Sequence, residues 1–148
     1  CIRLTNMPKE TISFKLDNRL SELETLNKKI DTFGVQAGLP KKCVFEIRLV
    51  LEEIFTNIAY YGSRDDRGHW IKVSMSCENN IITIQIEDDG IPFNPLDLEK
   101  PDLYCNLEDR DIGGLGIYLV KHYTKECVYK RRGNNNVLIL KKTISPDL

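Results

Sequence analysis

Residues 44–62, V-F-E-I-R-L-V-L-E-E-I-F-T-N-I-A-Y-Y-G, contain the clearest fold signal in the chain. Apolar side chains recur there at helical spacing, which is typical of a helix that packs against a core. Pro40 suits the start of this helix and Gly62 suits its end, so the segment predicts one long amphipathic helix. The apolar stripe consists of Val44, Ile47, Leu51, Ile54, Phe55 and Ile58.

The segment upstream predicts a strand followed by another helix. Residues 11–16, T-I-S-F-K-L, alternate apolar and polar side chains as a strand does. Asp17 or Asn18 would then cap a helix that Gly34 or Gly38 would end. The apolar positions of that helix are Leu20, Leu23, Leu26, Ile30 and Phe33.

The C-terminal half predicts two β-hairpins separated by a long loop and a short helix. Strands at residues 70–77 and 81–88 flank an E-N-N turn, and a second hairpin crosses G-N-N at residues 133–135. Residues 89–113 carry three prolines among charged side chains, and a loop of this length is typical of a functional lid. A helix over residues 115–123 follows. This order of elements predicts one sheet with helices on one face.

The composition is that of an ordinary globular protein. The 148 residues are 41% hydrophobic, and 21 basic against 22 acidic side chains leave a formal charge of −1. The length predicts a single domain over residues 1–148. The charge balance disfavours direct nucleic-acid binding, and no apolar run approaches a membrane span.

The cysteines predict a reducing compartment, so we expect a cytoplasmic protein. There are five, an odd number, and no two are close in sequence. Reduced thiols are therefore favoured over a disulfide framework or a Cys-x-x-Cys site. The N-terminus lacks a signal-peptide core, although a start at Cys1 leaves a removed segment open.

The first segment with chemical potential is E-E-I-F-T-N, residues 52–57. Glu53 and Asn57 lie one helical turn apart, on a face away from the centre of the apolar stripe. An amide oxygen is a hard ligand that suits Mg²⁺, and a neighbouring carboxylate can accept a proton from an attacking hydroxyl. The competing interpretation is an ordinary solvated helix face.

The second segment is E-D-D-G-I-P-F, residues 87–93. Strand parity places Asp88 on the apolar face and Asp89 on the other. A carboxylate at the end of an apolar face needs a partner, which a ligand amino group could supply, and Gly90 lets the backbone turn close to a ligand. The competing interpretation is a common turn built from Asp, Gly and Pro.

The third segment is I-G-G-L-G-I-Y-L-V, residues 112–120, in which glycines lead into a helix. Backbone N–H groups at a helix N-terminus bind phosphate well. The pattern is neither a P-loop nor a dinucleotide fingerprint, and a flexible hinge is the competing interpretation.

Together, the three segments resemble the GHKL ATPase superfamily, which includes gyrase and sensor histidine kinases. E-x-x-x-N at Glu53 and Asn57 is similar to its N box. The resemblance implies a Bergerat-type ATP-binding fold: an α+β two-layer sandwich of one mixed, mostly antiparallel sheet with three helices on one face. Two further motifs are similar to its glycine boxes, at Asp88, Gly90, Pro92 and Phe93, and at Gly113, Gly114, Leu115 and Gly116.

Three segments, E-E-I-F-T-N-I-A-Y-Y-G at 52–62, P-F-N-P at 92–95 and R-R-G-N-N-N-V-L-I-L-K-K at 131–142, are similar to those of one branch. Within the superfamily the chain therefore most resembles the anti-sigma-factor serine/threonine kinases, over residues 10–144. The resemblance implies that Glu53 is the general base, that Asn57 ligates Mg²⁺ and that Asp88 contacts the adenine of ATP. The other glycine-box residues would surround the nucleotide, and residues 94–112 would form the ATP lid. The implied partners are a sigma factor and a small anti-sigma antagonist protein that receives the phosphate, and a homodimer is compatible with the resemblance.

Two departures and two alternatives stay open. Tyr61 stands where many members have histidine, and Pro92 replaces the second glycine of the first box, which makes kinase activity a weaker expectation than ATP binding. A non-catalytic ATP-binding interaction module, or a regulatory domain of a longer signalling protein, is the alternative function. Histidine-kinase action is disfavoured because His69 and His122 lie on no long heptad helix.

Overall fold

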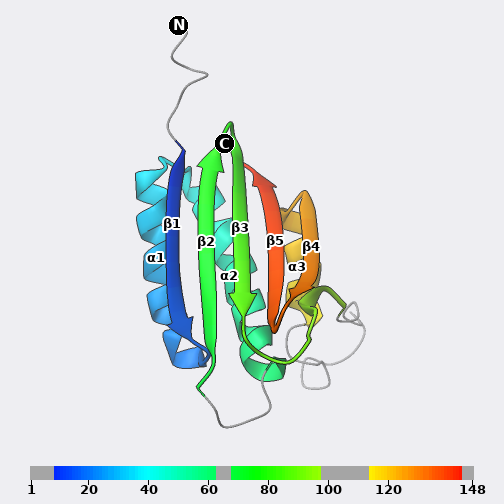
Figure 1. Ribbon diagram of the computed structural model, residues 1–148. Helices are drawn as coiled ribbons and strands as arrows, with labels where there is room; N and C mark the ends of the chain where they lie inside the picture. The colour runs from blue at the N-terminus through cyan, green and yellow to red at the C-terminus, as the bar shows by residue number, and fades with distance from the viewer. Residues whose placement is uncertain (1–8, 63–67, 98–113, 145–148) are drawn as a thin grey trace, which may run out of the picture.

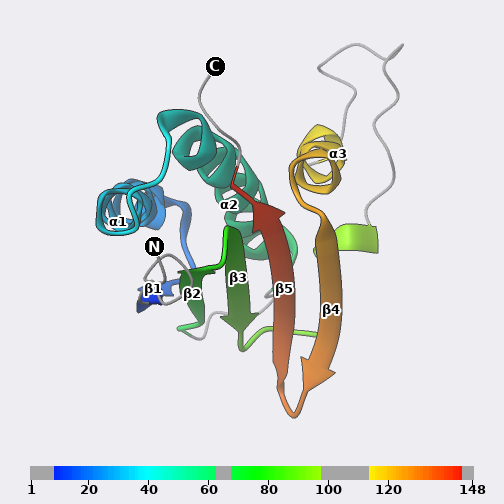
Figure 2. The same cartoon turned by 90° about the horizontal axis from the view of Figure 1, so that it is seen from above.

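The computed structural model describes residues 9–62, 68–97 and 114–144. In these ranges a five-stranded sheet carries three α-helices on one face, as the two perpendicular views show (Figures 1 and 2). The strands are β1 (Glu10–Asp17), β2 (Trp70–Glu78), β3 (Ile81–Asp88), β4 (Glu126–Arg132) and β5 (Asn135–Thr143). The helices are α1 (Leu23–Gln36), α2 (Lys41–Tyr61) and α3 (Gly114–Tyr123), with short 3-10 turns at Leu20–Glu22 and Pro95–Asp97. The predicted two-layer α+β sandwich is confirmed.

The strand order is β1-β2-β3-β5-β4, and all four pairings of the described strands are antiparallel. The sheet was expected to be mixed but mostly antiparallel, and its described strands pair only in the antiparallel sense. The β2–β3 turn is tight because Asn79 and Asn80 adopt positive φ angles of 53° and 68°, which match the twist of a two-residue hairpin. β3 and β5 are neighbours although a long segment separates them along the chain.

Helices α1 and α2 pack closely through Gly34. A Cβ atom on Gly34 would lie 2.6 Å from Cγ2 of Val44, so the glycine allows this close contact between the helices. Gly34 was one of two glycines that were predicted as the end of α1, and it lies inside the helix instead. The helix ends at Gln36, and Gly38 follows with a φ of +63°, as predicted for a terminating glycine.

The predicted cap at Asp17 or Asn18 is wrong. β1 extends through Asp17, and the chain then makes the 3-10 turn before α1 begins at Leu23. The Glu22 carboxylate instead accepts a hydrogen bond from the Asp17 N–H at 3.2 Å.

The core lies between the sheet and the helices. The inward side chains of β2 and β3 are buried, as the alternation predicted, and α2 supplies the largest helical share. In the described part of the chain, no helix is both long and apolar enough to span a bilayer. Among the described residues, Cys43, Cys77 and Cys127 form no disulfide bond, and Cys1 and Cys105 lie outside the described residues.

Candidate functional site

Asn57 lies on a covered face of α2, and Glu53, one helical turn before it, is partly buried. Asn57 is fully buried, and Glu46 and Val50 on the same face are buried too. The face is covered because α3 packs beside α2, which the helical pattern of α2 alone did not predict (Figure 2). The competing interpretation of a solvated helix face is therefore wrong.

The two side chains contact each other. Asn57 Nδ2 donates a hydrogen bond to Glu53 Oε1 at 3.3 Å. Burial raises the pKa of Glu53, and the hydrogen bond from Asn57 partly opposes this rise. Glu53 is therefore a stronger base than an ordinary surface glutamate.

The amide oxygen of Asn57 is a buried acceptor. Its Oδ1 accepts no hydrogen bond from the described residues. An unsatisfied buried acceptor is costly, and a hard cation is one group that satisfies a carboxamide oxygen. Asn57 therefore fits the role of a Mg²⁺ ligand.

Asp88 ends the apolar face of β3, as strand parity predicted. It is 2% exposed, and its Oδ1 accepts hydrogen bonds from Gly90 N at 2.9 Å and from Asn136 Nδ2 at 3.0 Å. Both bonds use the same oxygen, so Oδ2 has capacity for a further donor. The carboxylate was expected to find its hydrogen-bond donor in a ligand, and the Asn136 amide supplies one of its donors instead.

Asp89 points to the other side and has a separate role. Its Oδ1 accepts the Trp70 N–H at 3.1 Å and lies 3.1 Å from Nδ1 of His69. These contacts connect the start of β2 with the residue that follows β3. His69 is accordingly part of a side-chain pair at the sheet end.

Gly90 brings the end of β3 against the end of α2. A Cβ atom on Gly90 would lie 2.0 Å from the Gly62 carbonyl oxygen, and Ile91 N donates to that same oxygen at 2.9 Å. A side chain at position 90 is therefore excluded by the protein itself. This contact brings the segment that begins at Asp88 to the C-terminal end of α2, the helix that carries Asn57.

The rest of the first glycine box follows this turn. Phe93 is partly buried, and its ring packs on Tyr61 with 5.8 Å between ring centroids. Pro92 is exposed. Tyr61, one of the two departures from the family pattern, thus supports the turn that carries Phe93.

The second glycine box is placed only in part. Gly114, Leu115 and Gly116 form the first turn of α3, as predicted to within one residue. Gly113 lies outside the described residues, as does the predicted lid from residue 98 onward.

Three residues at the β4–β5 hairpin were missed. Asn136 Nδ2 donates a hydrogen bond to Asp88 Oδ1 at 3.0 Å, and the Tyr129 hydroxyl donates to Asn136 Oδ1 at 2.6 Å. Arg131 Nη1 donates to Asn136 Oδ1 at 3.1 Å and to the Gly90 carbonyl at 2.8 Å. The sequence shows only R-R-G-N-N-N, which is typical of a turn. Finding them needs the β3–β5 register, in which Asn136 lies opposite Asp88.

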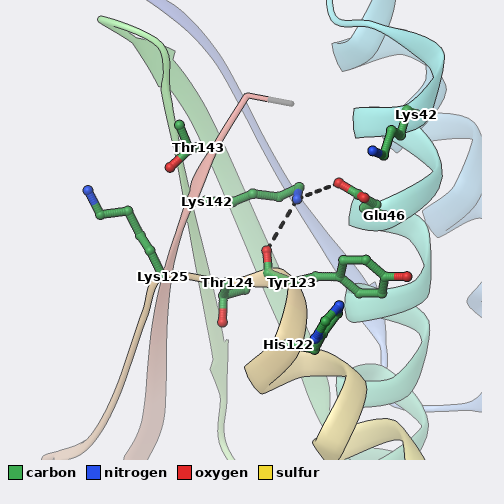
Figure 3. Close-up of a pocket in the computed structure, with 8 residues that line it drawn as sticks. All are labelled: Lys42, Glu46, His122, Tyr123, Thr124, Lys125, Lys142 and Thr143. Carbon is green, nitrogen blue, oxygen red and sulfur yellow. Dashed lines mark hydrogen bonds and ion pairs between the residues drawn. The ribbon is translucent and has the colours of Figure 1, made fainter. Parts of the chain in front are cut away.

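A different pocket, of about 500 Å³, lies at the C-terminal end of α3 (Figure 3). Inside it, Lys142 Nζ donates to Glu46 Oε1 at 2.6 Å and to the Tyr123 carbonyl at 3.2 Å. The Lys142 ammonium therefore joins β5 to α2 through the ion pair and to the end of α3 through the hydrogen bond. The pocket is lined by Lys42, Glu46, His122, Tyr123, Thr124, Lys125, Lys142 and Thr143, none of which is a predicted site residue.

The burial of Asp88 predicts a pH-dependent stability cost. Burial raises the pKa of this carboxyl more than the hydrogen bonds from Asn136 and Gly90 lower it. The folded state therefore binds the proton more tightly than the unfolded chain, and stability declines as pH rises above the unfolded value of about 3.9. We expect Asp88→Asn, which keeps an Oδ1 acceptor, to gain stability relative to wild type between about pH 4 and pH 7.

Urea unfolding of both proteins at the two pH values measures this gain. Asp89→Asn, on the opposite sheet face, is the matched control. An equal pH-dependent gain in both variants would show that the burial of Asp88 is not its cause.

Residues 16–142 match the family model of the histidine kinase-like ATPase domain. The chain belongs to this family. The predicted superfamily is thereby confirmed, and nucleotide use is a property of the histidine kinase-like ATPase family as a whole.

Curated relatives of this chain are named kinases and anti-sigma factors. The serine/threonine-protein kinase BtrW of Bordetella bronchiseptica is 25% identical over 103 residues, which cover 70% of this chain and 72% of BtrW. The anti-sigma F factor of Geobacillus thermodenitrificans is 24% identical over 101 residues, or 68% of this chain and 69% of that protein.

Among solved structures, the RsbU and RsbW domains of Rv1364c from Mycobacterium tuberculosis share the fold. The TM-score is 0.64 at 11% identity, and the match covers 93% of this chain but only 32% of that longer one. It therefore supports the fold alone.

Proposed function

We propose that this chain is an ATP-dependent serine/threonine protein kinase of the anti-sigma type. The observation that carries the proposal is the pair on α2: half-buried Glu53, with a raised pKa, is hydrogen-bonded to Asn57, whose buried amide oxygen accepts no hydrogen bond from the described residues. A binding module has no use for a base at this place. The names of the curated relatives support the same class.

Asp88 would recognise the adenine. Its Oδ1 is engaged by the protein, so Oδ2 would accept a hydrogen bond from the exocyclic amino group of adenine. The first turn of α3, with Gly113 before it, would offer backbone N–H groups to the phosphates. Phe93, Pro92 and Gly90 would line the nucleotide site between the adenine and the phosphates.

Glu53 and Asn57 would act at the phosphates. Asn57 Oδ1 would hold Mg²⁺, which when bound neutralises phosphate charge. Glu53 would take the proton from a serine or threonine hydroxyl as that oxygen bonds to the γ-phosphorus. The bond from the γ-phosphorus to the bridging oxygen breaks, and ADP leaves with the electron pair.

The protein substrate would be a small anti-sigma antagonist, and a sigma factor would be the second partner. A pull-down from the source cell with and without Mg-ATP, followed by phosphosite mapping, tests both. We expect a sigma factor among the captured proteins and a phosphorylated serine or threonine on a small one. Capture without any phosphorylated partner would favour the non-catalytic ATP-binding module.

Adenine recognition makes a prediction that separates the two neighbouring aspartates. Asp88→Asn replaces one carboxylate oxygen by a donor, so we expect ATP affinity to fall about ten- to a hundredfold, the value of one charge-assisted hydrogen bond. Asp89→Asn retains an acceptor for the Trp70 N–H and should change ATP affinity little. Calorimetric titration with Mg-ATP measures both. Equal losses at the two positions would refute the assignment of Asp88.

A further inference from the structure

Asn136 uses the full hydrogen-bonding capacity of its side chain. It is 3% exposed and lies on β5 directly opposite Asp88 of β3. Its Nδ2 donates to Asp88 Oδ1 at 3.0 Å and to the Ile91 carbonyl at 2.7 Å. Its Oδ1 accepts from Phe93 N at 3.1 Å, the Tyr129 hydroxyl at 2.6 Å and Arg131 Nη1 at 3.1 Å.

This saturation limits what Asn136 can do. A carboxamide has two N–H donors, and both are engaged by Asp88 and Ile91. Three donors converge on its one oxygen, which fixes the orientation of the amide. The side chain therefore has no donor left for a ligand and can influence one only through Asp88 or the turn.

The turn after Asp88 is held at three backbone positions by this corner of the sheet. Asn136 binds Ile91 O and Phe93 N, and Arg131 Nη1 donates to the Gly90 carbonyl at 2.8 Å. Tyr129 and Arg131 come from β4, so the edge hairpin braces a turn that starts at β3. Residues 90–93 are thus fixed relative to β5 as well as to α2.

We propose that Asn136, braced by Tyr129 and Arg131, is a positioning residue for adenine recognition. It engages Oδ1 of Asp88 together with Gly90 N, so that the carboxylate presents Oδ2 to the base in one orientation. This lowers the ordering cost that the ligand would otherwise meet on binding. The proposal rests on the proposed binding of ATP by Asp88.

The chain provides a matched control one residue away. Asn135 Nδ2 donates to Glu87 Oε2 at 2.7 Å, so the neighbouring pair repeats the same chemistry. β-strand alternation places this pair on the opposite face of the sheet. Asn135→Ala thus removes the same kind of contact from the same strand without touching Asp88.

The test is calorimetric titration of five proteins with Mg-ATP: wild type, Asn136→Ala, Asn135→Ala, Asp88→Asn and the double variant Asp88→Asn/Asn136→Ala. We expect Asn136→Ala to lower ATP affinity about tenfold and Asn135→Ala less than about twofold. In the Asp88→Asn background, loss of Asn136 should cost less than about twofold more, because both changes act on one contact.

A second ligand separates positioning from general damage. Inorganic tripolyphosphate lacks the adenine group, so its affinity should be the same for wild type and for Asn136→Ala. An equal loss of tripolyphosphate and ATP affinity, or a full tenfold loss in the Asp88→Asn background, would overturn the proposal. Wild type that fails to bind ATP would instead refute the proposed function and this inference with it.

If Asn136→Ala does not fold, exposed Arg131 provides a milder variant. Arg131→Gln removes the hydrogen bond from the guanidinium to the Gly90 carbonyl. It should lower ATP affinity about two- to fivefold in the wild-type background but not in the Asp88→Asn background. Arg132→Gln, at the next exposed position, is its control. Equal effects of these two variants would also contradict the proposal.

Discussion

Glu53→Gln is expected to abolish most phosphate transfer while leaving ATP binding nearly unchanged. The glutamine keeps the shape and can still accept the Asn57 hydrogen bond, but it cannot take a proton. A general base acts mainly in the transition state, so the rate should fall about a hundredfold or more without a matching loss of affinity. Transfer of labelled phosphate to the captured partner, together with Mg-ATP titration, measures the two quantities separately.

The neighbouring glutamate provides the control for this variant. Glu52 accepts a hydrogen bond from Asn27 of α1 at 2.8 Å, so Glu52→Gln alters the same residue type on a different face of α2. Its transfer rate should stay close to that of wild type. Asn57→Ala should lower binding and transfer together. A Glu53→Gln protein that transfers phosphate at the wild-type rate would show that Glu53 is not the base.

Lys142→Ala is expected to be among the most destabilising substitutions in the described part of the chain. The side chains of Lys142 and Glu46 are only 4% and 7% exposed, and the ammonium also binds the Tyr123 carbonyl (Figure 3). Removing the lysine leaves a buried carboxylate without its cation, which typically costs about 3–5 kcal/mol. Urea unfolding of purified protein gives this value directly.

An exposed ion pair next to it calibrates the result. Lys141 lies 3.8 Å from Glu126, with both side chains about half exposed, so Lys141→Ala should cost less than about 1 kcal/mol. The double change Glu46→Leu/Lys142→Met removes both charges and should recover most of the lost stability. Equal costs for Lys142→Ala and Lys141→Ala would contradict the burial argument.

Local patterns predicted the parts of this structure that local chemistry determines. The apolar stripe predicted where α2 begins and ends. The alternation of the strand predicted that Asp88 lies on the buried face of the sheet and Asp89 on the other. These periodicities follow from helix and strand geometry alone. The segments that resemble the N box and the first glycine box could be recognised because each lies within a few consecutive residues.

Features that depend on packing between distant segments were not predicted. The burial of Asn57 requires α3 beside α2, and the role of Asn136 requires β5 beside β3 in one register. Gly34 and Gly38 were left as alternative ends of α1, because the sequence does not show that Val44 approaches Gly34. In each case the missing information was a neighbour from another element rather than a local preference.

The seam between β3 and β5 has a consequence for the order in which the chain folds. The β2–β3 and β4–β5 hairpins close over tight turns, whereas Asp88 and Asn136 are 48 residues apart. Closing the long loop between them costs chain entropy before any contact across the seam is gained. We therefore expect the two hairpins to form early and to join late. The corner that carries Asp88 would be among the last parts of the sheet to assemble and among the first to open.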